Sequence, residues 1–303
     1  MSTQEPALYI FGEVLFDCFP DAAPVLGGAP FNVAWHLNAF GAKTHLISAV
    51  GKDELGEKIT QAMREWGLAT HYTQQHPDLP TGTVNVHFDN NEPHYTISAP
   101  VAFDAISDTD AQPLQQSDIF YHGSLALREE HNRHSLAKWL AHSKARRFID
   151  VNLRDPWWSL ETLMPTLQYA TCVKLNSDEL RRLSHSDAPL NDDNLLQYAA
   201  EFRRQNNIVN LLITRGEHGA VLIDAKDEHY TAGPPPQSPN FVDTVGAGDA
   251  FSAVALLGLT HDWSWPTTLA RAQEFASFIV TQRGATCSKA DIYDDFLHFW
   301  GMR

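Results

Sequence analysis

Four consecutive residues near the end of the chain have the types and spacing that phosphoryl transfer requires. Gly246, Ala247 and Gly248 are followed at once by Asp249 and then by the apolar stretch AFSAVALLGL, which predicts a helix. Glycines let a chain turn tightly, and the first N–H groups of a helix have no partners inside it. We therefore expect an anion-binding site at the start of this helix.

Asp249 is predicted to lie in the first turn of that helix, beside whatever anion the backbone holds. The positive end of the helix dipole favours the ionised carboxylate there. A carboxylate beside an anion opposes simple binding, but it suits phosphoryl transfer, in which it accepts the proton of an attacking hydroxyl. A tight turn with a capping aspartate is the purely structural alternative, and a Gly-Ala-Gly motif alone does not exclude it.

The segments around this motif alternate between strand and helix. Apolar runs predict strands at residues 7–12, 43–51, 118–123, 146–152, 172–176, 209–214 and 220–224. Helical periodicity predicts helices at residues 30–41, 53–67, 129–143, 193–206, 248–259, 267–282 and 290–300. This alternation indicates an α/β fold, in which a mostly parallel sheet is covered by helices on both faces.

One segment breaks the alternation of strand and helix. Residues 83–97 read TVNVHFDNNEPHYTI, in which Val84, Val86 and Phe88 fall on one face and Asn90-Asn91 supplies turn residues. The pattern predicts an antiparallel hairpin that belongs to a small sheet outside the main one, in the position of a lid.

Polar residues follow several of the predicted strands. They are Asp17, Asn152, Arg154, Asn176 and Thr214. Ligands of open α/β sheets bind outside the carboxyl ends of the strands, so this distribution indicates a site at that edge.

Composition excludes several classes of partner. The 303 residues include 22 basic and 37 acidic side chains, and a formal charge of −15 disfavours nucleic acid and membrane surfaces. Three widely spaced cysteines without a CxxC pair suggest reduced thiols in a cytoplasmic protein, and the N-terminus lacks the features of a signal peptide. His131 and His134 have a suggestive spacing, but no third ligand is near them, so we assign no zinc site.

The string VDTVGAGDAF resembles the D-T-x-G-A-G-D signature of the ribokinase-like, or PfkB, carbohydrate kinases. Further segments are similar to family motifs in the family's order, and they cover most of the chain: GGAPFNVAWHLNAFG, AVGKDELG, TGTVNV, DVNLRDPWW, KLNSDEL and ITRGEHGA. The resemblance implies a three-layer sandwich with a mostly parallel central sheet and a small β-sheet lid. It also implies one kinase domain over residues 1–303, with lid segments at about 14–27 and 82–100.

The resemblance assigns roles to individual residues. Asp249 resembles the catalytic base, and Gly246, Ala247 and Gly248 resemble the anion hole. The implied sugar-binding residues are Asp17, Gly28, Asn32 and Arg154. The implied ATP-binding residues are Lys174, Asn176, Thr214, Gly216 and Gln273. Beyond Gln273, Glu274 and Phe275 are bulkier than the small residues that relatives carry near the adenine.

The resemblance also implies cofactors and a substrate. Glu179 corresponds to a residue that helps to hold Mg²⁺ through water, and Asp243 to a ligand of a monovalent cation, usually K⁺. The GGAPFNVA and DVNLRDPWW segments are most similar to those of fructokinases, so we expect transfer of the γ-phosphoryl group of ATP to fructose. Two copies of the chain are expected to pair through the lid, as in many relatives.

Several alternatives remain open at this point. Within the family they are a 2-keto-3-deoxygluconate kinase and a kinase for aminoimidazole riboside or another nucleoside. A non-catalytic sugar-binding sensor would keep the same fold. A nicotinamide oxidoreductase would suit an α/β chain, but its GxGxxG fingerprint does not occur in the sequence, and neither does the GxxxxGK[ST] motif of P-loop ATPases.

Overall fold

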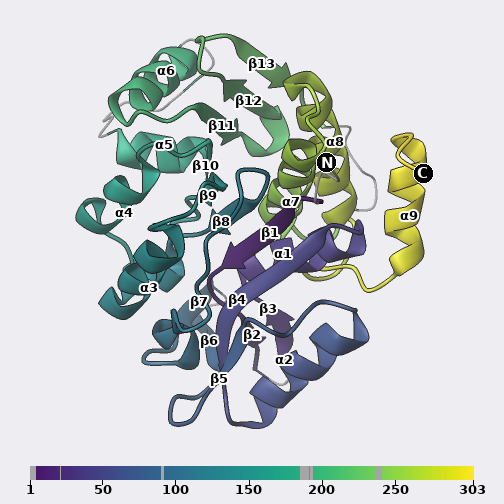
Figure 1. Cartoon of the computed structure of the whole chain (residues 1–303). Helices are drawn as coiled ribbons and strands as arrows, with labels where there is room; N and C mark the ends of the chain where they lie inside the picture. Colours follow the sequence, from purple (N-terminus) through teal and green to yellow (C-terminus); the bar gives the residue numbers. More distant parts are fainter. Residues whose placement is uncertain (1–4, 21, 90–91, 185–190, 192–193, 236–240) are drawn as a thin grey trace.

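The computed structural model describes residues 5–20, 22–89, 92–184, 191, 194–235 and 241–303. Within the described residues, nine strands form the central sheet in the order β13-β12-β11-β10-β9-β8-β1-β4-β5 (Figure 1). Neighbours are parallel except at β11–β12 and β12–β13. The strands are β1 (Ala7–Phe11), β4 (Lys43–Gly51), β5 (Thr73–His76), β8 (Ile119–His122), β9 (Arg146–Asp150), β10 (Cys172–Asn176), β11 (Asn210–Thr214), β12 (Ala220–Ile223) and β13 (His229–Ala232).

Helices cover both faces of this sheet, which confirms the predicted three-layer α/β architecture. One apolar core is shared by α1 (Ala29–Ala39), α2 (Glu54–Glu65), α7 (Ala247–Thr260), α8 (Trp265–Ile279) and α9 (Ala290–Phe299). On the other face lie α3 (Glu130–Leu140), α4 (Leu160–Leu167), α5 (Ser177–Leu183) and α6 (Leu195–Gln205). Short 3₁₀ turns are η1 (Ala102–Ala105), η2 (Leu125–Arg128) and η3 (Gly216–His218). None of the helices in the described part of the chain has the length and apolarity needed to cross a membrane.

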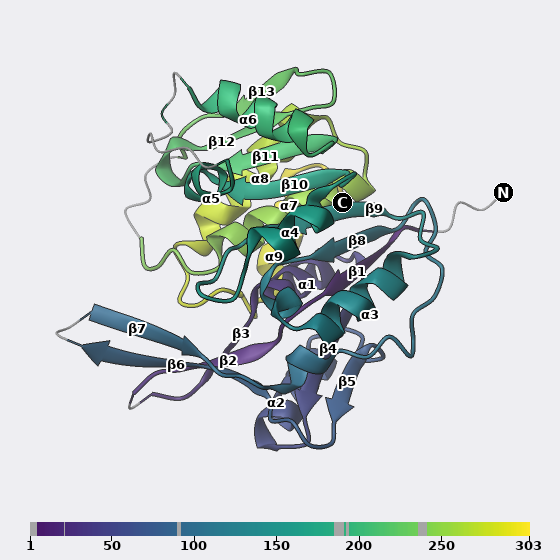
Figure 2. The ribbon, with the colours of Figure 1, turned by 90° about the vertical axis from the view of Figure 1, so that its left-hand side faces the viewer.

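A second sheet projects from the main body (Figure 2). Its strands lie in the order β3-β2-β6-β7. They are β2 (Leu15–Cys18), β3 (Val25–Gly27), β6 (Gly82–Asp89) and β7 (Glu92–Ile97). The predicted hairpin is confirmed as β6 and β7, with Val86 opposite Tyr95. Its predicted turn at Asn90-Asn91 and the side chain of Phe88 lie outside the described residues. Tyr95 is 63% exposed, and both the lid function and pairing of two copies through this sheet stay predictions.

Asp53 connects the start of α2 to the residue that precedes the second sheet. Its side chain caps α2 by accepting a hydrogen bond from Gly56 N (2.8 Å), and it accepts two more from Thr81, from N (2.8 Å) and Oγ1 (2.6 Å). Thr81 Oγ1 in turn accepts from Gly51 N (2.9 Å). The backbone approaches so closely that a Cβ on Gly51 would lie 2.5 Å from Thr81 N. The AVGKDELG segment therefore forms the joint between the two sheets.

Replacing Asp53 by alanine is expected to lower the free energy of unfolding by about 1–3 kcal/mol. The change removes a helix cap together with the hydrogen bonds to Thr81. Urea denaturation monitored by circular dichroism measures it. Asp291→Ala is the matched control, because Asp291 lies in the first turn of α9 without capping it. Equal stabilities of the two variants would contradict the role of Asp53.

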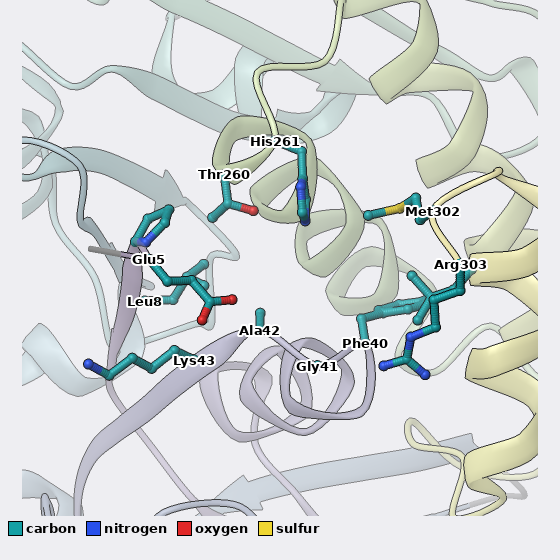
Figure 3. Close-up of a pocket in the computed structure, with 12 residues that line it drawn as sticks. Glu5, Leu8, Phe40, Gly41, Ala42, Lys43, Thr260, His261, Met302 and Arg303 are labelled. Atoms are coloured by element: carbon teal, nitrogen blue, oxygen red, sulfur yellow. The ribbon is translucent and has the colours of Figure 1, made fainter. Parts of the chain in front are cut away.

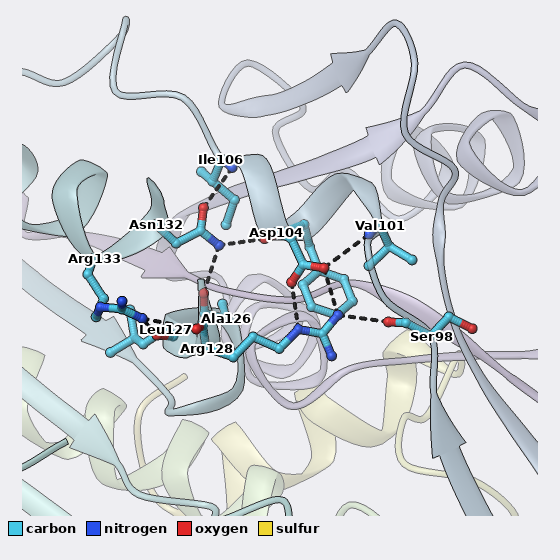
Figure 4. A network of polar contacts seen from close by, with 10 residues as sticks. Ser98, Val101, Asp104, Ile106, Ala126, Leu127, Arg128, Asn132 and Arg133 are labelled. Atoms are coloured by element: carbon cyan, nitrogen blue, oxygen red, sulfur yellow. Dashed lines mark hydrogen bonds and ion pairs between the residues drawn. The ribbon is translucent and has the colours of Figure 1, made fainter. Parts of the chain in front are cut away.

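A buried ion pair fixes the chain as it leaves β7 (Figure 4). Arg128 donates to both oxygens of Asp104 (2.7 Å each) and to the carbonyl of Ser98 (2.7 Å). Its guanidinium also lies 4.4 Å from the ring centroid of Trp157. Asn132 completes the network by donating to the carbonyls of η1 and η2. The base of the second sheet is thereby attached firmly to the main body.

Candidate active site

The candidate site lies at the carboxyl ends of the parallel strands. β1, β8, β9, β10 and β11 are parallel neighbours, so their carboxyl ends share one edge of the sheet. Asn176 and Thr214 are the last residues of β10 and β11, and Arg154 follows β9. Asp17 reaches the same region from β2, the first strand of the second sheet after β1. The helices α1 and α7 begin at this edge.

Gly246 sets the conformation of the α7 start. It is the N-cap residue, in the left-handed region with φ 80° and ψ −7°. A Cβ at this position would lie 2.4 Å from Cα and 2.7 Å from the carbonyl oxygen of Ala285. Just before it, Asp243 Oδ1 accepts a hydrogen bond from Val245 N (3.1 Å). Glycine is therefore required at 246 both for its backbone conformation and for the close approach of residue 285.

The segment around Ala285 is itself held by α1. His36 Nε2 is hydrogen-bonded to the Ala285 carbonyl (3.0 Å), and Nδ1 to the Tyr293 hydroxyl (2.8 Å). Because a carbonyl only accepts, Nε2 carries the hydrogen. Burial lowers the pKa of His36 to about 4, so the ring is neutral at physiological pH. Trp35 adds a hydrogen bond to the carbonyl of Cys287 (3.0 Å). Residues far apart in sequence thus fix the anion-binding turn.

Asp249 lies in the first turn of α7, where its Oδ2 accepts a hydrogen bond from Asn32 Nδ2 (2.8 Å). Burial, together with the charge of Asp150, raises the pKa of Asp249 to about 6. The Asn32 hydrogen bond and the charges of Lys174 and Arg154 act in the opposite direction. Burial thus acts against the helix dipole, which was expected from the sequence to favour the ionised form. The carboxylate is still ionised above about pH 6.

A buried ion pair between β9 and β10 contacts the first turns of α7. Asp150 Oδ2 accepts from Lys174 Nζ and from Ser252 Oγ, both at 2.7 Å. Lys174 was predicted to contact ATP, and its Nζ lies 3.6 Å from the position that a Cβ on Gly248 would occupy. The lysine is buried and paired, so it acts on the α7 start mainly through its charge.

Asp17, Gly28 and Arg154 form the other end of the site. Asp17 Oδ2 lies 3.3 Å from the position of a Cβ on Gly27, and a Cβ on Gly28 would lie 2.7 Å from the carbonyl oxygen of Glu13. Burial raises the pKa of Asp17, and the charge of Arg154 lowers it. Arg154 also lowers the pKa of Asp249. In the described part of the chain the guanidinium of this exposed arginine makes no hydrogen bond or ion pair.

Three of the predicted ATP-binding residues line one pocket of about 530 Å³. They are Asn176, Thr214 and Gly216. Glu179 shapes its wall: Oε1 accepts from Leu153 N and Oε2 from Asn176 N, both at 2.8 Å, while Asn176 Oδ1 accepts from Glu179 N (2.8 Å). This reciprocal capping box starts α5. Burial raises the pKa of Glu179.

Gln273 does not line that pocket. Its bulky neighbours point elsewhere: Phe275 is buried in the core, and Glu274 accepts a hydrogen bond from Trp300 Nε1 (2.7 Å). Within the described residues, no group of three His, Cys, Asp or Glu side chains is placed to bind a metal ion.

Another pocket, of about 270 Å³, lies far from these residues (Figure 3). It is lined by Leu8, Phe40, Leu297 and Met302, together with Glu5, Lys43, His261 and Arg303. These residues come from the start of β1, the ends of α1 and α7 and the C-terminus, at the opposite edge of the sheet. None of the predicted site residues lies there, so the chemistry is assigned to the edge that carries Asp249.

Comparison with known proteins agrees with the geometry. A model of the pfkB family carbohydrate kinases matches residues 21–291. A fructokinase from Escherichia coli is 30% identical over 298 residues, covering 92% of this chain and 94% of that protein. The fold is shared with aminoimidazole riboside kinase from Salmonella enterica, solved with aminoimidazole riboside and an ATP analogue (TM-score 0.82, 24% identity, 96% of this chain and 99% of that one). It is shared equally with a double mutant of fructokinase from Vibrio cholerae O395, solved with fructose, ADP and a potassium ion (TM-score 0.81, 23% identity, 98% and 100%).

Proposed function

The chain belongs to the pfkB family of carbohydrate kinases, and on that premise we propose that it transfers the γ-phosphoryl group of ATP to a hydroxyl of fructose. The observation that carries the proposal is the placement of Asp249. It lies in the first turn of α7, directly behind the left-handed Gly246, and Asn32 orients its carboxylate. A base and the first amides of α7 therefore meet at one point, where the amide of Ala247 also donates a long hydrogen bond to the carbonyl of Thr244 (3.3 Å).

Each group has a definite part in the proposed reaction. Asp249 accepts the proton of the attacking hydroxyl, and the amides of Gly246, Ala247 and Gly248 bind the transferring phosphoryl group. Asp17, Gly28, Asn32 and Arg154 bind the sugar. The second sheet closes over it and excludes water.

ATP is assigned to the pocket of Asn176, Thr214 and Gly216. Lys174 precedes Asn176 on β10, and its Nζ lies 3.6 Å from the position of a Cβ on Gly248. Mg²⁺ bound to the phosphates would neutralise their charge. Both Glu179 oxygens already accept amide hydrogen bonds, so a contact through water suits them better than direct ligation. Asp243 Oδ1 is engaged by Val245, and the remaining carboxylate oxygen suits K⁺.

Charge at the sugar end favours a neutral substrate. Asp17 and Asp249 bring two carboxylates there, while Arg128 is already paired with Asp104 and Lys174 with Asp150. Among the described residues, the guanidinium of Arg154 remains to compensate them. A sugar acid such as 2-keto-3-deoxygluconate would add a further negative charge, so we favour fructose. The likeness to a solved riboside kinase makes aminoimidazole riboside the second candidate.

A panel of acceptors, tested by ADP release with Mg²⁺ and K⁺ varied, tests this proposal. We expect the highest kcat/KM with fructose and the lowest with 2-keto-3-deoxygluconate. A preference for aminoimidazole riboside would correct the substrate and keep the reaction. Absence of ADP release with every acceptor, despite sugar binding, would identify a non-catalytic sensor instead.

The pH dependence of the reaction follows from Asp249. Its pKa is raised to about 6, and only the ionised form accepts a proton. We therefore expect kcat/KM to fall about tenfold for each pH unit below pH 6. A pH series with saturating ATP measures this. A rate that stays constant down to pH 4.5 would contradict proton acceptance by this group.

A further inference from the structure

Glu13 is a buried acid that the reaction described above does not use. It follows β1 directly, and its side chain is 3% exposed. Oε2 is buried and has no hydrogen-bond partner among the described residues. In that same part of the chain, no lysine, arginine or histidine lies within ion-pair distance of its carboxyl group. An ionised carboxylate in such a place would have little to compensate its charge.

The surroundings of Glu13 connect it to the proposed base. Its carbonyl lies against Gly28 at the start of α1, and α1 presents Asn32 to Asp249. Two more buried polar atoms here lack partners among the described residues: Asn32 Oδ1 and the hydroxyl of Tyr121 on β8. Burial raises the pKa of Tyr121, and the charges of Asp150, Asp249 and Glu13 add to this. Three elements thus place unpartnered polar groups around Asp249.

The nearby cations are poorly placed to hold a second negative charge. Arg128 on η2 is committed to Asp104, and Arg154 is exposed to solvent. A buried, unpaired carboxylate is destabilised by several kcal/mol, and binding a proton removes that cost.

We propose that Glu13 is a second carboxyl of the active site, that it keeps its proton at pH values at which Asp249 is already ionised, and that it thereby leaves Asp249 as the single anion facing the acceptor hydroxyl. The idea rests on the proposed kinase reaction. Glu13 would act as a positioning residue, because it works through Asp249 and does not touch the reacting atoms. Its ionisation would place an extra negative charge beside both the base and the incoming phosphoryl group.

The electrostatics of the pair agree with this division of roles. Burial raises the pKa of Glu13 to about 7; the charge of Asp249 adds to this, and Arg154 and Arg128 oppose it. The pKa of Asp249 is raised only to about 6. When the surroundings of two neighbouring carboxyl groups give them different pKa values, one group is ionised while the other still holds its proton. Activity should therefore decline again as the pH rises above about 7.

Infrared titration of the protein without substrates tests the proton directly. At pH 7, where Asp249 is mostly ionised, the wild type should show the carbonyl band of a protonated carboxylic acid that disappears at higher pH, and this component should be absent from Glu13→Gln. A wild-type spectrum without this component, or the same component in Glu13→Gln, would overturn the proposal. Because no turnover is involved, this result is independent of whether the protein is a fructose kinase.

The kinetic test uses the same variant, since glutamine imitates the neutral acid. Glu13→Gln should keep kcat/KM at pH 7 within about tenfold of the wild type and should lose the decline at alkaline pH. Glu57→Gln, an exposed position on α2, is the matched control and should keep the decline. A larger loss of kcat/KM at pH 7 would show that the ionised form of Glu13 is needed. An alkaline decline that is unchanged in Glu13→Gln would show that another group causes the decline. Either result would overturn the proposal.

Discussion

Replacing Asp249 by asparagine is expected to lower kcat by at least ~10²-fold while the sugar still binds. Asparagine keeps the shape of the side chain and retains an oxygen that can accept the hydrogen bond of Asn32. It has no basic carboxylate to take the proton of the attacking hydroxyl. The loss should therefore appear in kcat, measured by ADP release, and hardly in the sugar affinity, measured by calorimetry.

The same variant is expected to be more stable than the wild type at pH 7. The folded pKa of Asp249, about 6, lies above its ordinary value of 3.8, so the folded state binds the proton more tightly than the unfolded chain. This group therefore destabilises the fold progressively as the pH rises from 3.8 through 6, and fully above that. The amide of the Asp249→Asn variant does not ionise, so the variant escapes this loss of stability. A higher melting temperature with lower turnover would separate catalysis from folding.

Asp295→Asn, at an exposed position on α9, is the control for both measurements. It should change neither the turnover nor the melting temperature. Turnover of Asp249→Asn equal to that of the control would rule out Asp249 as the base.

Replacing Gly246 by alanine is expected to lower kcat by about 10²–10³-fold, the effect of losing one well-placed amide donor. The new methyl group would lie 2.4 Å from Cα of Ala285, and the backbone there is left-handed. The turn must shift, because His36 holds residue 285 in place. The amides would then no longer point at the transferring phosphoryl group.

Gly301→Ala separates this effect from ordinary backbone strain. Gly301 has a φ of 69°, and nothing lies within 4 Å of the position that its Cβ would take. The control should lose about 1 kcal/mol of stability and keep its activity. Comparable kcat values for the two variants, both measured well below their melting temperatures, would contradict an anion hole at Gly246.

Much of the fold follows from local patterns in the sequence. The strand and helix segments that were predicted are all present, because their apolar periodicity is strong. The helix α4 was missed, since it is short and contains Pro165, and β5 was missed because TQQH is a polar edge strand without alternation. The capping box of Asn176 and Glu179 was within the quoted KLNSDEL segment, yet α5 was not predicted.

The site residues that lie together in one sequence motif could be predicted. Those that only the fold brings together could not. Asp249 and its three preceding residues lie together, as their sequence requires. Asp150, His36 and Glu13 were not identified, because each is a single polar residue inside an apolar segment. Their partners are distant in sequence: Ser252 lies 102 residues from Asp150, and Ala285 lies 249 residues from His36. Of these three residues, only Asp150 had a local signal in the sequence, because it is an acid at the end of the apolar segment FID.

The most direct measurement is a crystal structure with fructose, ADP and a planar metal fluoride that imitates the phosphoryl group in transfer. The account predicts an Asp249 carboxylate oxygen at ~2.6–3.2 Å from the acceptor hydroxyl, with the fluoride bound by the amides of residues 246–248. A complex in which the hydroxyl faces another group, or in which those amides bind no part of the fluoride, would contradict it.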